Sequence, residues 1–284
     1  MNVFKYSNDN KRYHTRAYEG RVWKACIDAG LPCPSLCAFC ADRSHLFTTK
    51  GSVTEQLEKE RDRIFEKHGE VPLCAYFQSG TNTNAPVEKL RVLYDEAVSF
   101  PGVTSLSIAT RFDCLPDEVL DLLEEYSPTV ELGLQTIHRD DYDLFLLKYN
   151  ELKKRGIKVC LHLMNGLPGE TKEMMIDTAK AVGELRPDAL KIHLTYVAEG
   201  TELARLYKEG KYAPMTFEDY TRTVVEQLEY IPAETVIERV TGDGDKRTLL
   251  APLWSKDKIR VLGTIDKLFA ELDTYQGKKY NTGI

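Results

Sequence analysis

Residues 157–197, IKVCLHLMNGLPGETKEMMIDTAKAVGELRPDALKIHLTYV, contain the clearest signal of the chain's architecture. Its two ends, 157–164 and 189–197, are short runs rich in apolar and β-branched residues, as expected of buried strands. Between them, residues 170–185 have the spacing of an amphipathic helix, which ends before Pro187. A strand, a helix and a second strand in this order predict a βαβ unit with two parallel strands.

The same alternation extends toward the N-terminus. Four further runs read as strands, at 22–27, 73–77, 103–110 and 129–134. Helical patterns lie at 53–68, 86–98, 116–126 and 140–155. Pro86 and Pro116 are placed to begin two of these helices, and Gly156 to end a third. Six strands separated by helices predict an α/β fold, a partial (βα)6 barrel of parallel strands with right-handed crossovers.

The alternation fades after Ile231, where a short strand at 235–240 and a last helix from about Ser255 remain. We therefore expect three segments. They are an N-terminal lead-in over 1–20, a barrel core over 21–231, and a short C-terminal extension over 232–284 that packs on the barrel.

The composition is that of a globular protein, with 42% apolar and 29% charged residues. No run approaches the roughly 18 apolar residues of a membrane span, and the first 20 residues lack a signal-peptide pattern, so we expect a cytoplasmic protein that contacts no membrane. The net charge of −6 disfavours a wide nucleic-acid interface. Local basic stretches are interpreted as solvated helix faces: Lys148, Lys153, Lys154, Arg155 and Lys158, and then Lys256, Lys258 and Arg260.

Three of the seven cysteines, Cys33, Cys37 and Cys40, fall on the loop after the first strand in the pattern C-x3-C-x2-C. Three thiolates on a short loop can hold a [4Fe-4S] cluster and leave one iron open. The alternative is a zinc site in which His45 is the fourth ligand. The remaining cysteines are interpreted as buried apolar side chains: Cys26, Cys74, Cys114 and Cys160.

Polar residues follow strand after strand, where the functional residues of a parallel sheet gather. Gln78, Ser79, Gly80 and Thr81 follow the second strand, and Arg111 follows the third. A surface salt bridge is the alternative role for Arg111. For Gln78, Ser79, Gly80 and Thr81, the alternative is that they form an ordinary polar turn.

The fourth and fifth strands carry further polar residues. Glu131 and Gln135 share one face of the fourth strand, where they either contact a ligand or form a structural network inside the barrel. Asn165, Gly166 and Leu167 close the fifth strand, and Gly166 allows the backbone to approach a flat ring. His162 and His193 lie on strands five and six, as core histidines or as groups near a substrate.

The three-cysteine loop after the first strand of a βα array resembles the radical S-adenosylmethionine (radical SAM) superfamily. The segments 131–136 (ELGLQT), 166–171 (GLPGET), 190–196 (LKIHLTY) and 200–203 (GTEL) resemble its elongator-catalytic-subunit-like branch. The segments 76–86 (YFQSGTNTNAP), 107–111 (SIATR), 113–116 (DCLP) and 241–243 (TGD) are closer to the short bacterial YhcC-like family.

The resemblance implies two cofactors, a [4Fe-4S] cluster on the three cysteines and S-adenosyl-L-methionine on its open iron. It places Gln78, Ser79, Gly80 and Thr81 at the methionine amino group, and Arg111 at the carboxylate or ribose. It also places Glu131 and Gln135 at the ribose, and Phe39, Asn165, Gly166 and Leu167 near the adenine.

The implied reaction is reductive cleavage of S-adenosylmethionine to a 5′-deoxyadenosyl radical, which abstracts hydrogen from a substrate. An electron donor such as flavodoxin or ferredoxin would be a partner, and the branch suggests tRNA, modified at its wobble uridine, as substrate. The alternatives are a small-molecule or protein substrate, or a non-catalytic zinc or iron-sulfur binding protein.

Overall fold

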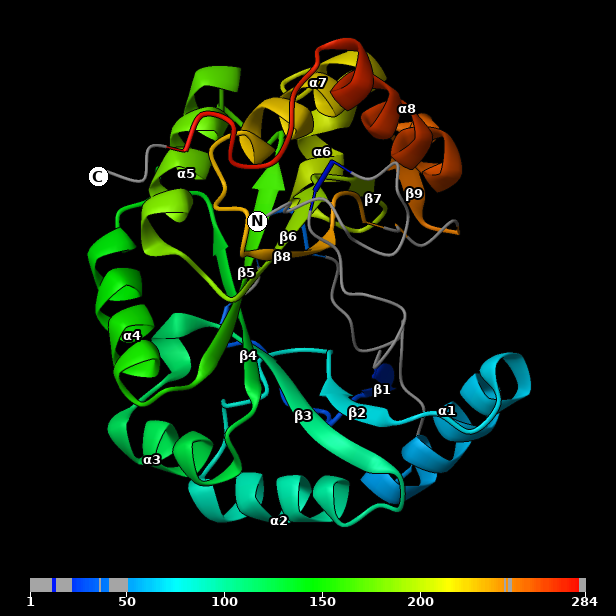
Figure 1. The fold of residues 1–284 in the computed structure, drawn as a ribbon, viewed down its shortest axis with the longest axis vertical. Helices are drawn as coiled ribbons and strands as arrows, with labels where there is room; N and C mark the ends of the chain where they lie inside the picture. Colours follow the sequence, from blue (N-terminus) through cyan, green and yellow to red (C-terminus); the bar gives the residue numbers. More distant parts are fainter. Residues whose placement is uncertain are drawn as a thin grey trace.

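The computed structural model describes residues 12–13, 22–35, 37–40, 51–242, 244 and 247–280. Its centre is a seven-stranded parallel sheet in the order β1-β2-β3-β4-β5-β6-β8, which curls into a half-barrel (Figure 1). The strands are β1 (Trp23–Ile27), β2 (Leu73–Phe77), β3 (Val103–Thr110), β4 (Thr129–Gln135), β5 (Lys158–Asn165), β6 (Ala189–Leu194) and β8 (Val236–Arg239). The predicted α/β partial barrel is confirmed.

Helices connect consecutive strands and cover the outer side of the curved sheet (Figure 1). They are α1 (Val53–His68), α2 (Val87–Val98), α3 (Asp117–Tyr126), α4 (Tyr142–Lys154), α5 (Lys172–Leu185) and α7 (Phe217–Leu228). Apolar side chains at alternate strand positions, such as Ile108, Leu132 and Leu161, are fully buried. Since neighbouring strand residues point to opposite faces, the intervening residues line the inside of the half-barrel.

Local sequence signals account for the helix bounds. Ser52 and Glu55 form a reciprocal capping box before α1, which begins and ends where the sequence predicts. Pro86 and Pro116 are N-caps, one residue before the position expected for them, which is within the usual uncertainty of a helix end. Gly156 follows α4 with a φ of 71°, a conformation that favours glycine.

The chain after Ile231 contributes more to the sheet than expected. Its short strand, β8, pairs in parallel with β6, so the sheet has seven strands where six were predicted for the barrel. The last helix, α8 (Lys258–Glu271), packs against α7 on the outside. The domain bounds expected at residues 20 and 231 stay a prediction.

A smaller unit stands at the carboxyl ends of the strands. It consists of β7 (Val197–Ala198), β9 (Leu249–Ala251) and α6 (Glu202–Lys208), with β7 and β9 antiparallel. Two short 3-10 helices complete the described elements, η2 (Phe112–Cys114) and η3 (Leu253–Lys256). Among the helices of the described residues, none has the length and apolar character needed to cross a membrane.

Candidate active site

The loop after β2 holds the start of the cysteine loop. Gly80 has a φ of 75°, and a Cβ at this position would lie 1.9 Å from the carbonyl oxygen of Leu31, so the close approach requires glycine. Asn84 Nδ2 donates to the carbonyl of Pro32 over 2.9 Å. Thr81 Oγ1 donates to Cys33 Sγ over 3.1 Å. Gly80 and Thr81, two of the predicted site residues, therefore contact the segment that carries the cysteines.

A second contact holds the other half of the cysteine loop. The backbone N–H of Leu203, in the first turn of α6, donates to the carbonyl of Ala38 over 2.9 Å. Phe39 is half-buried and packs against a small apolar cluster that includes Leu203 and Tyr212. The loop is thus fixed between the β2 side and the α6 side of the half-barrel.

The three predicted metal ligands lie together on this loop, but they are not closed around one point. Cys33 is exposed and contacts Thr81, whereas the Cys40 thiol hydrogen-bonds to Cys37. Within the described part of the chain, no three His, Cys, Asp or Glu side chains are arranged as a metal site. His45, the alternative zinc ligand, lies outside the described residues.

The electrostatics of the loop favour a thiolate. The hydrogen bond from Cys40 lowers the pKa of the Cys37 thiol to about 6; burial opposes this shift, and the positive charge of Arg111 supports it. Arg111 Nη1 lies 3.9 Å from Cys37 Sγ. The thiolate is the metal-binding form of cysteine, so the chemistry of these donors suits an iron-sulfur cluster.

Arg111 also forms a two-pronged ion pair. Its Nε and Nη2 donate to the carboxylate of Asp113 over 2.9 and 2.6 Å. The salt bridge weighed from the sequence is therefore present, and Arg111 also lies beside the cysteine loop. Its predicted contact with the cofactor stays a prediction.

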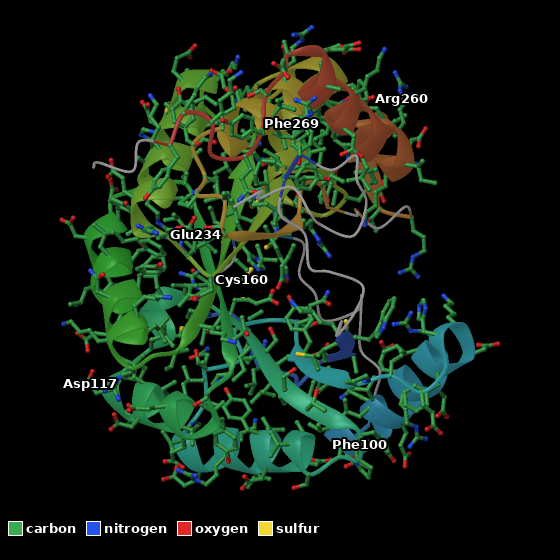
Figure 2. The ribbon with its side chains drawn as sticks, in the orientation of Figure 1. Phe100, Asp117, Cys160, Glu234, Arg260 and Phe269 are labelled. Carbon is green, nitrogen blue, oxygen red and sulfur yellow. The ribbon has the colours of Figure 1, made fainter. Side chains whose placement is uncertain are left out.

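Glu131 lies at the centre of a polar cluster inside the half-barrel. Its side chain is 0% exposed, and it accepts hydrogen bonds from Tyr76 over 2.6 Å and from Ser107 over 2.9 Å. Lys24 and Lys191 also donate to it. Cys160, its neighbour in register on β5, lies near the middle of the sheet in Figure 2.

His162 completes the shell around Glu131. Its Nε2 is 2.9 Å from Glu131 Oε2. Burial alone would raise the pKa of Glu131, but the hydrogen bond from His162 and the charges of Lys191 and Lys24 outweigh it, so the pKa lies well below its usual range. Glu131 is a carboxylate whose oxygens are occupied by the chain itself; its predicted contact with a ribose stays a prediction.

Glu238 gives the cluster its second negative charge. Lys24 Nζ donates to Glu238 Oε2 over 2.7 Å, and Lys191 Nζ lies 3.7 Å from the same oxygen. Two lysines and two glutamates balance, which is the condition under which charges are tolerated in a protein interior. The result is a polar floor (Lys24, Tyr76, Ser107, Glu131, His162, Lys191 and Glu238) with one residue from each of the seven strands.

Sequence reasoning missed most of this polar floor. Lys24 and Lys191 interrupt otherwise apolar runs, and a charged residue inside a buried strand is the signal that reveals such a network. Their partners, however, meet only because the sheet curls. For Glu131, the network matches the structural role inside the barrel, which was one of the two roles that the sequence left open.

Gln135 ends β4 in a conformation that is unusual for its residue type. Its φ is 69°, and the strand pairing shifts register between Gly133 and Gln135. A Cβ on Gly133 would lie 2.7 Å from Gln135 Nε2, so the amide occupies the space that glycine leaves. Strained backbone of this kind clusters at functional sites, which supports Gln135 as a site residue.

The end of β5 is fixed by the elements around it. The side-chain amides of Asn165 and Gln227 donate to each other over 2.8 and 2.9 Å, so the Asn165 side chain is engaged with α7. Tyr212 donates to the carbonyl of Gly166 over 2.7 Å, and Met215 covers the position of a Cβ on Gly166. Leu167, the third predicted residue at this strand end, is half-buried.

The remaining predicted residues lie close by. Gln78 is exposed and Ser79 is buried at the carboxyl end of β2.

Of the basic residues on and near α4, Lys153 pairs with Asp188 over 2.6 Å and Arg155 with Asp121 over 2.7 Å. These cations are neutralised within the chain, in agreement with their interpretation as a solvated helix face.

Comparison with known proteins places this architecture. The Radical SAM superfamily profile matches residues 32–182, and the Radical SAM C-terminal domain profile matches residues 187–271. YtqA of Bacillus subtilis is 40% identical over 309 residues, covering 98% of this chain and 95% of YtqA. YhcC of Escherichia coli K12 is 32% identical over 281 residues, covering 90% of each chain.

Two more distant proteins share part of the chain or the fold. A tRNA uridine(34) acetyltransferase of Methanocaldococcus jannaschii is 32% identical over 152 residues, which cover 49% of this chain and 28% of that protein. The structure of Elp3 from Methanocaldococcus infernus superposes with a TM-score of 0.71 at 18% identity. It covers 90% of this chain, which spans 64% of the Elp3 chain. The chain belongs to the radical SAM superfamily, in agreement with its half-barrel and its three-cysteine loop, and is an enzyme of the radical SAM type.

Proposed function

We propose that this protein binds a [4Fe-4S] cluster through Cys33, Cys37 and Cys40, and S-adenosylmethionine beside it, to act on a substrate held in the half-barrel. One observation carries the proposal: three thiols on one loop stand at the carboxyl ends of the strands, held from the β2 side and from the α6 side. When bound, these cofactors supply a 5′-deoxyadenosyl radical that abstracts hydrogen from a substrate carbon.

The chain's own residues bind and orient. Gln78 to Thr81 and Arg111 lie at the strand ends next to the cysteine loop, where they are available to the amino-acid part of S-adenosylmethionine. Gln135 is available to the ribose, and Phe39, Leu167 and the backbone of Asn165 and Gly166 to the adenine. The buried polar floor closes the interior below them. An electron donor such as flavodoxin or ferredoxin is the proposed protein partner.

For the substrate we favour tRNA at its wobble uridine. Support comes from the partial match to tRNA uridine(34) acetyltransferases and from the fold shared with Elp3. The paired state of Lys153 and Arg155 favours a second candidate, a small molecule or a protein side chain, because paired cations contribute little to phosphate binding.

The first experiment uses anaerobic, iron-reconstituted protein. We expect a reduced electron paramagnetic resonance signal of a [4Fe-4S] cluster that shifts with S-adenosylmethionine, and 5′-deoxyadenosine formed only with reductant. Changing Cys33, Cys37 and Cys40 together to Ala abolishes both, whereas Cys74→Ala, which removes a buried thiol on β2, retains them. A zinc-bound protein, or a cluster that ignores S-adenosylmethionine, would instead establish a binding protein.

The substrate is tested separately. Addition of undermodified tRNA should raise the rate of 5′-deoxyadenosine formation, and tRNA binding should weaken with salt. A Lys153→Gln, Arg155→Gln double variant should bind tRNA as the unchanged protein does. If tRNA has no effect on either measurement, the small-molecule or protein-substrate candidate replaces it.

A further inference from the structure

The contact between Glu131 and His162 fixes which imidazole nitrogen carries the proton. Glu131 has a lowered pKa and is ionised, so its oxygen accepts and His162 Nε2, at 2.9 Å, donates. In a neutral imidazole, the other nitrogen is then an acceptor with a free lone pair. His162 therefore has a donor nitrogen held by the chain and an acceptor nitrogen, Nδ1.

The imidazole of His162 is neutral at physiological pH. Burial lowers its pKa, the hydrogen bond to Glu131 opposes this shift, and the positive charges of Lys191 and Lys24 support it. His193 lies beside it, with ring centroids 5.1 Å apart. Burial and the proximity of His162 lower the pKa of His193 well below its usual range. Two neutral imidazoles are thus side by side.

These two rings face the interior of the half-barrel. The His162 side chain is 17% exposed, and its neighbour in register on β4 is Gly133, beside which the Gln135 amide lies. His193 Nε2 is buried and has no hydrogen-bond partner among the described residues. Leaving a buried polar nitrogen without a partner is costly, and a bound ligand that supplies the hydrogen bond would recover that cost. The unpartnered nitrogen is an independent sign that a ligand belongs here.

We propose that His162 and His193 bind the –CO–NH– edge of the substrate, with Glu131 as the residue that positions His162. The substrate N–H donates to His162 Nδ1, and the substrate carbonyl accepts from His193 Nε2–H. An amide or imide edge presents an N–H donor and a carbonyl acceptor side by side, which suits two neighbouring rings whose centroids are 5.1 Å apart. This proposal rests on the proposed function, under which the –CO–NH– edge that binds is the imide edge of a uracil ring.

The test compares uridine with 3-methyluridine, in which a methyl group replaces the imide hydrogen. The protein is the reconstituted, oxidised holoenzyme with ¹⁵N-labelled histidine, and the readout is the ¹⁵N chemical shift of each ring nitrogen. Before ligand addition, His162 should be protonated at Nε2 alone from about pH 7 to 8, because burial lowers its pKa. Uridine should then shift His162 Nδ1 and His193 Nε2, and 3-methyluridine at the same concentration should not shift His162 Nδ1.

Variants separate binding from folding. His162→Gln keeps an amide N–H that can reach Glu131 but moves the acceptor from the ring Nδ1 position to the amide oxygen, so uridine binding should weaken about tenfold. His138→Gln, at an exposed histidine that contacts the Met174 carbonyl, is the matched control and should bind uridine normally. Glu131→Gln should give a mixture of His162 tautomers, which a merely structural role of Glu131 would not produce.

Every result of these measurements either supports or overturns the proposed contact between the two histidines and the substrate. Equal shifts with uridine and 3-methyluridine, no shift with either, or a charged His162 imidazolium would overturn the inference. Failure of the proposed function is a different result, the absence of 5′-deoxyadenosine from the unchanged protein. In His138→Gln, 5′-deoxyadenosine formation without substrate should stay within about twofold of the unchanged protein, since this exposed histidine lies outside the proposed substrate site.

Discussion

Lys24 on β1 and Glu238 on β8 meet across the half-barrel, with Nζ 2.7 Å from Oε2, although their strands are the two opposite edges of the sheet. The contact links residues 214 positions apart. No backbone ladder joins these edges, because β1 pairs with β2 and β8 with β6. Side chains of the polar floor thus link the two edges from inside.

Removal of Lys24 should destabilise the fold. Lys24→Met leaves the charges of Glu131 and Glu238 with one lysine instead of two, and we expect the free energy of unfolding to fall by about 2 kcal/mol. Lys154→Met breaks an exposed ion pair with Glu151 and should change it by less than about 0.5 kcal/mol. Urea unfolding measures both. Equal values for the two variants would show that the floor does not depend on its charge balance.

A methyl group at Gly80 should displace the cysteine loop. Gly80→Ala places a Cβ against the carbonyl of Leu31, whereas Gly102→Ala, at a φ of 89°, meets no atom within 4 Å. Both variants carry the strain of a positive φ, so their difference isolates the clash. We expect Gly80→Ala to cost about 2 kcal/mol more and to lower iron incorporation during reconstitution. Equal stability and equal iron content would contradict this.

Cys37 should react as a thiolate near neutral pH. Its pKa of about 6 predicts that alkylation by iodoacetamide in metal-free, reduced protein reaches half its maximal rate near that pH. For Cys114, burial raises the pKa to about 11, so it should remain unreactive throughout the neutral range. Peptide mass spectrometry distinguishes the two sites. An alkylation midpoint of Cys37 at the usual thiol pKa of about 8.5 would contradict the prediction.

The two interior histidines should make stability depend on pH. Their pKa values are lowered on folding, so the unfolded chain binds more protons, and stability is lost as the pH falls below the unfolded value of about 6.5. The loss is at most about 1.4 kcal/mol per histidine for each pH unit. We expect His193→Gln to reduce the slope between about pH 6.5 and 5.5 in urea unfolding. An unchanged slope would show that His193 is charged in the folded protein.

The fold could be predicted from the sequence because each part of it is local. The apolar run at 157–164 and the helix pattern after it identify a βαβ unit, and the capping box at Ser52 fixes the start of α1. The addition of β8 to the sheet could not be predicted. Its short run resembles many edge segments, and only the curled sheet brings it beside β6.

The candidate site, too, could be predicted only where its signals are local in the sequence. The cysteine spacing and the polar strand ends are visible in the chain, and Thr81 indeed contacts Cys33. The partners of Glu131 come from five other strands, so their meeting depends on curvature, which no local pattern encodes. The reciprocal pairing of Asn165 with Gln227 was hidden for the same reason.

The two attachments of the cysteine loop have a mechanical consequence. One attachment, at Gly80, Thr81 and Asn84, belongs to an early strand of the sheet; the other, Leu203 to Ala38, belongs to the unit that follows β6. The loop therefore bridges two parts of the half-barrel whose separation depends on how tightly the sheet curls. Any change in the curl of the sheet would therefore move the two attachments relative to each other, with the segment that carries the cysteines held between them.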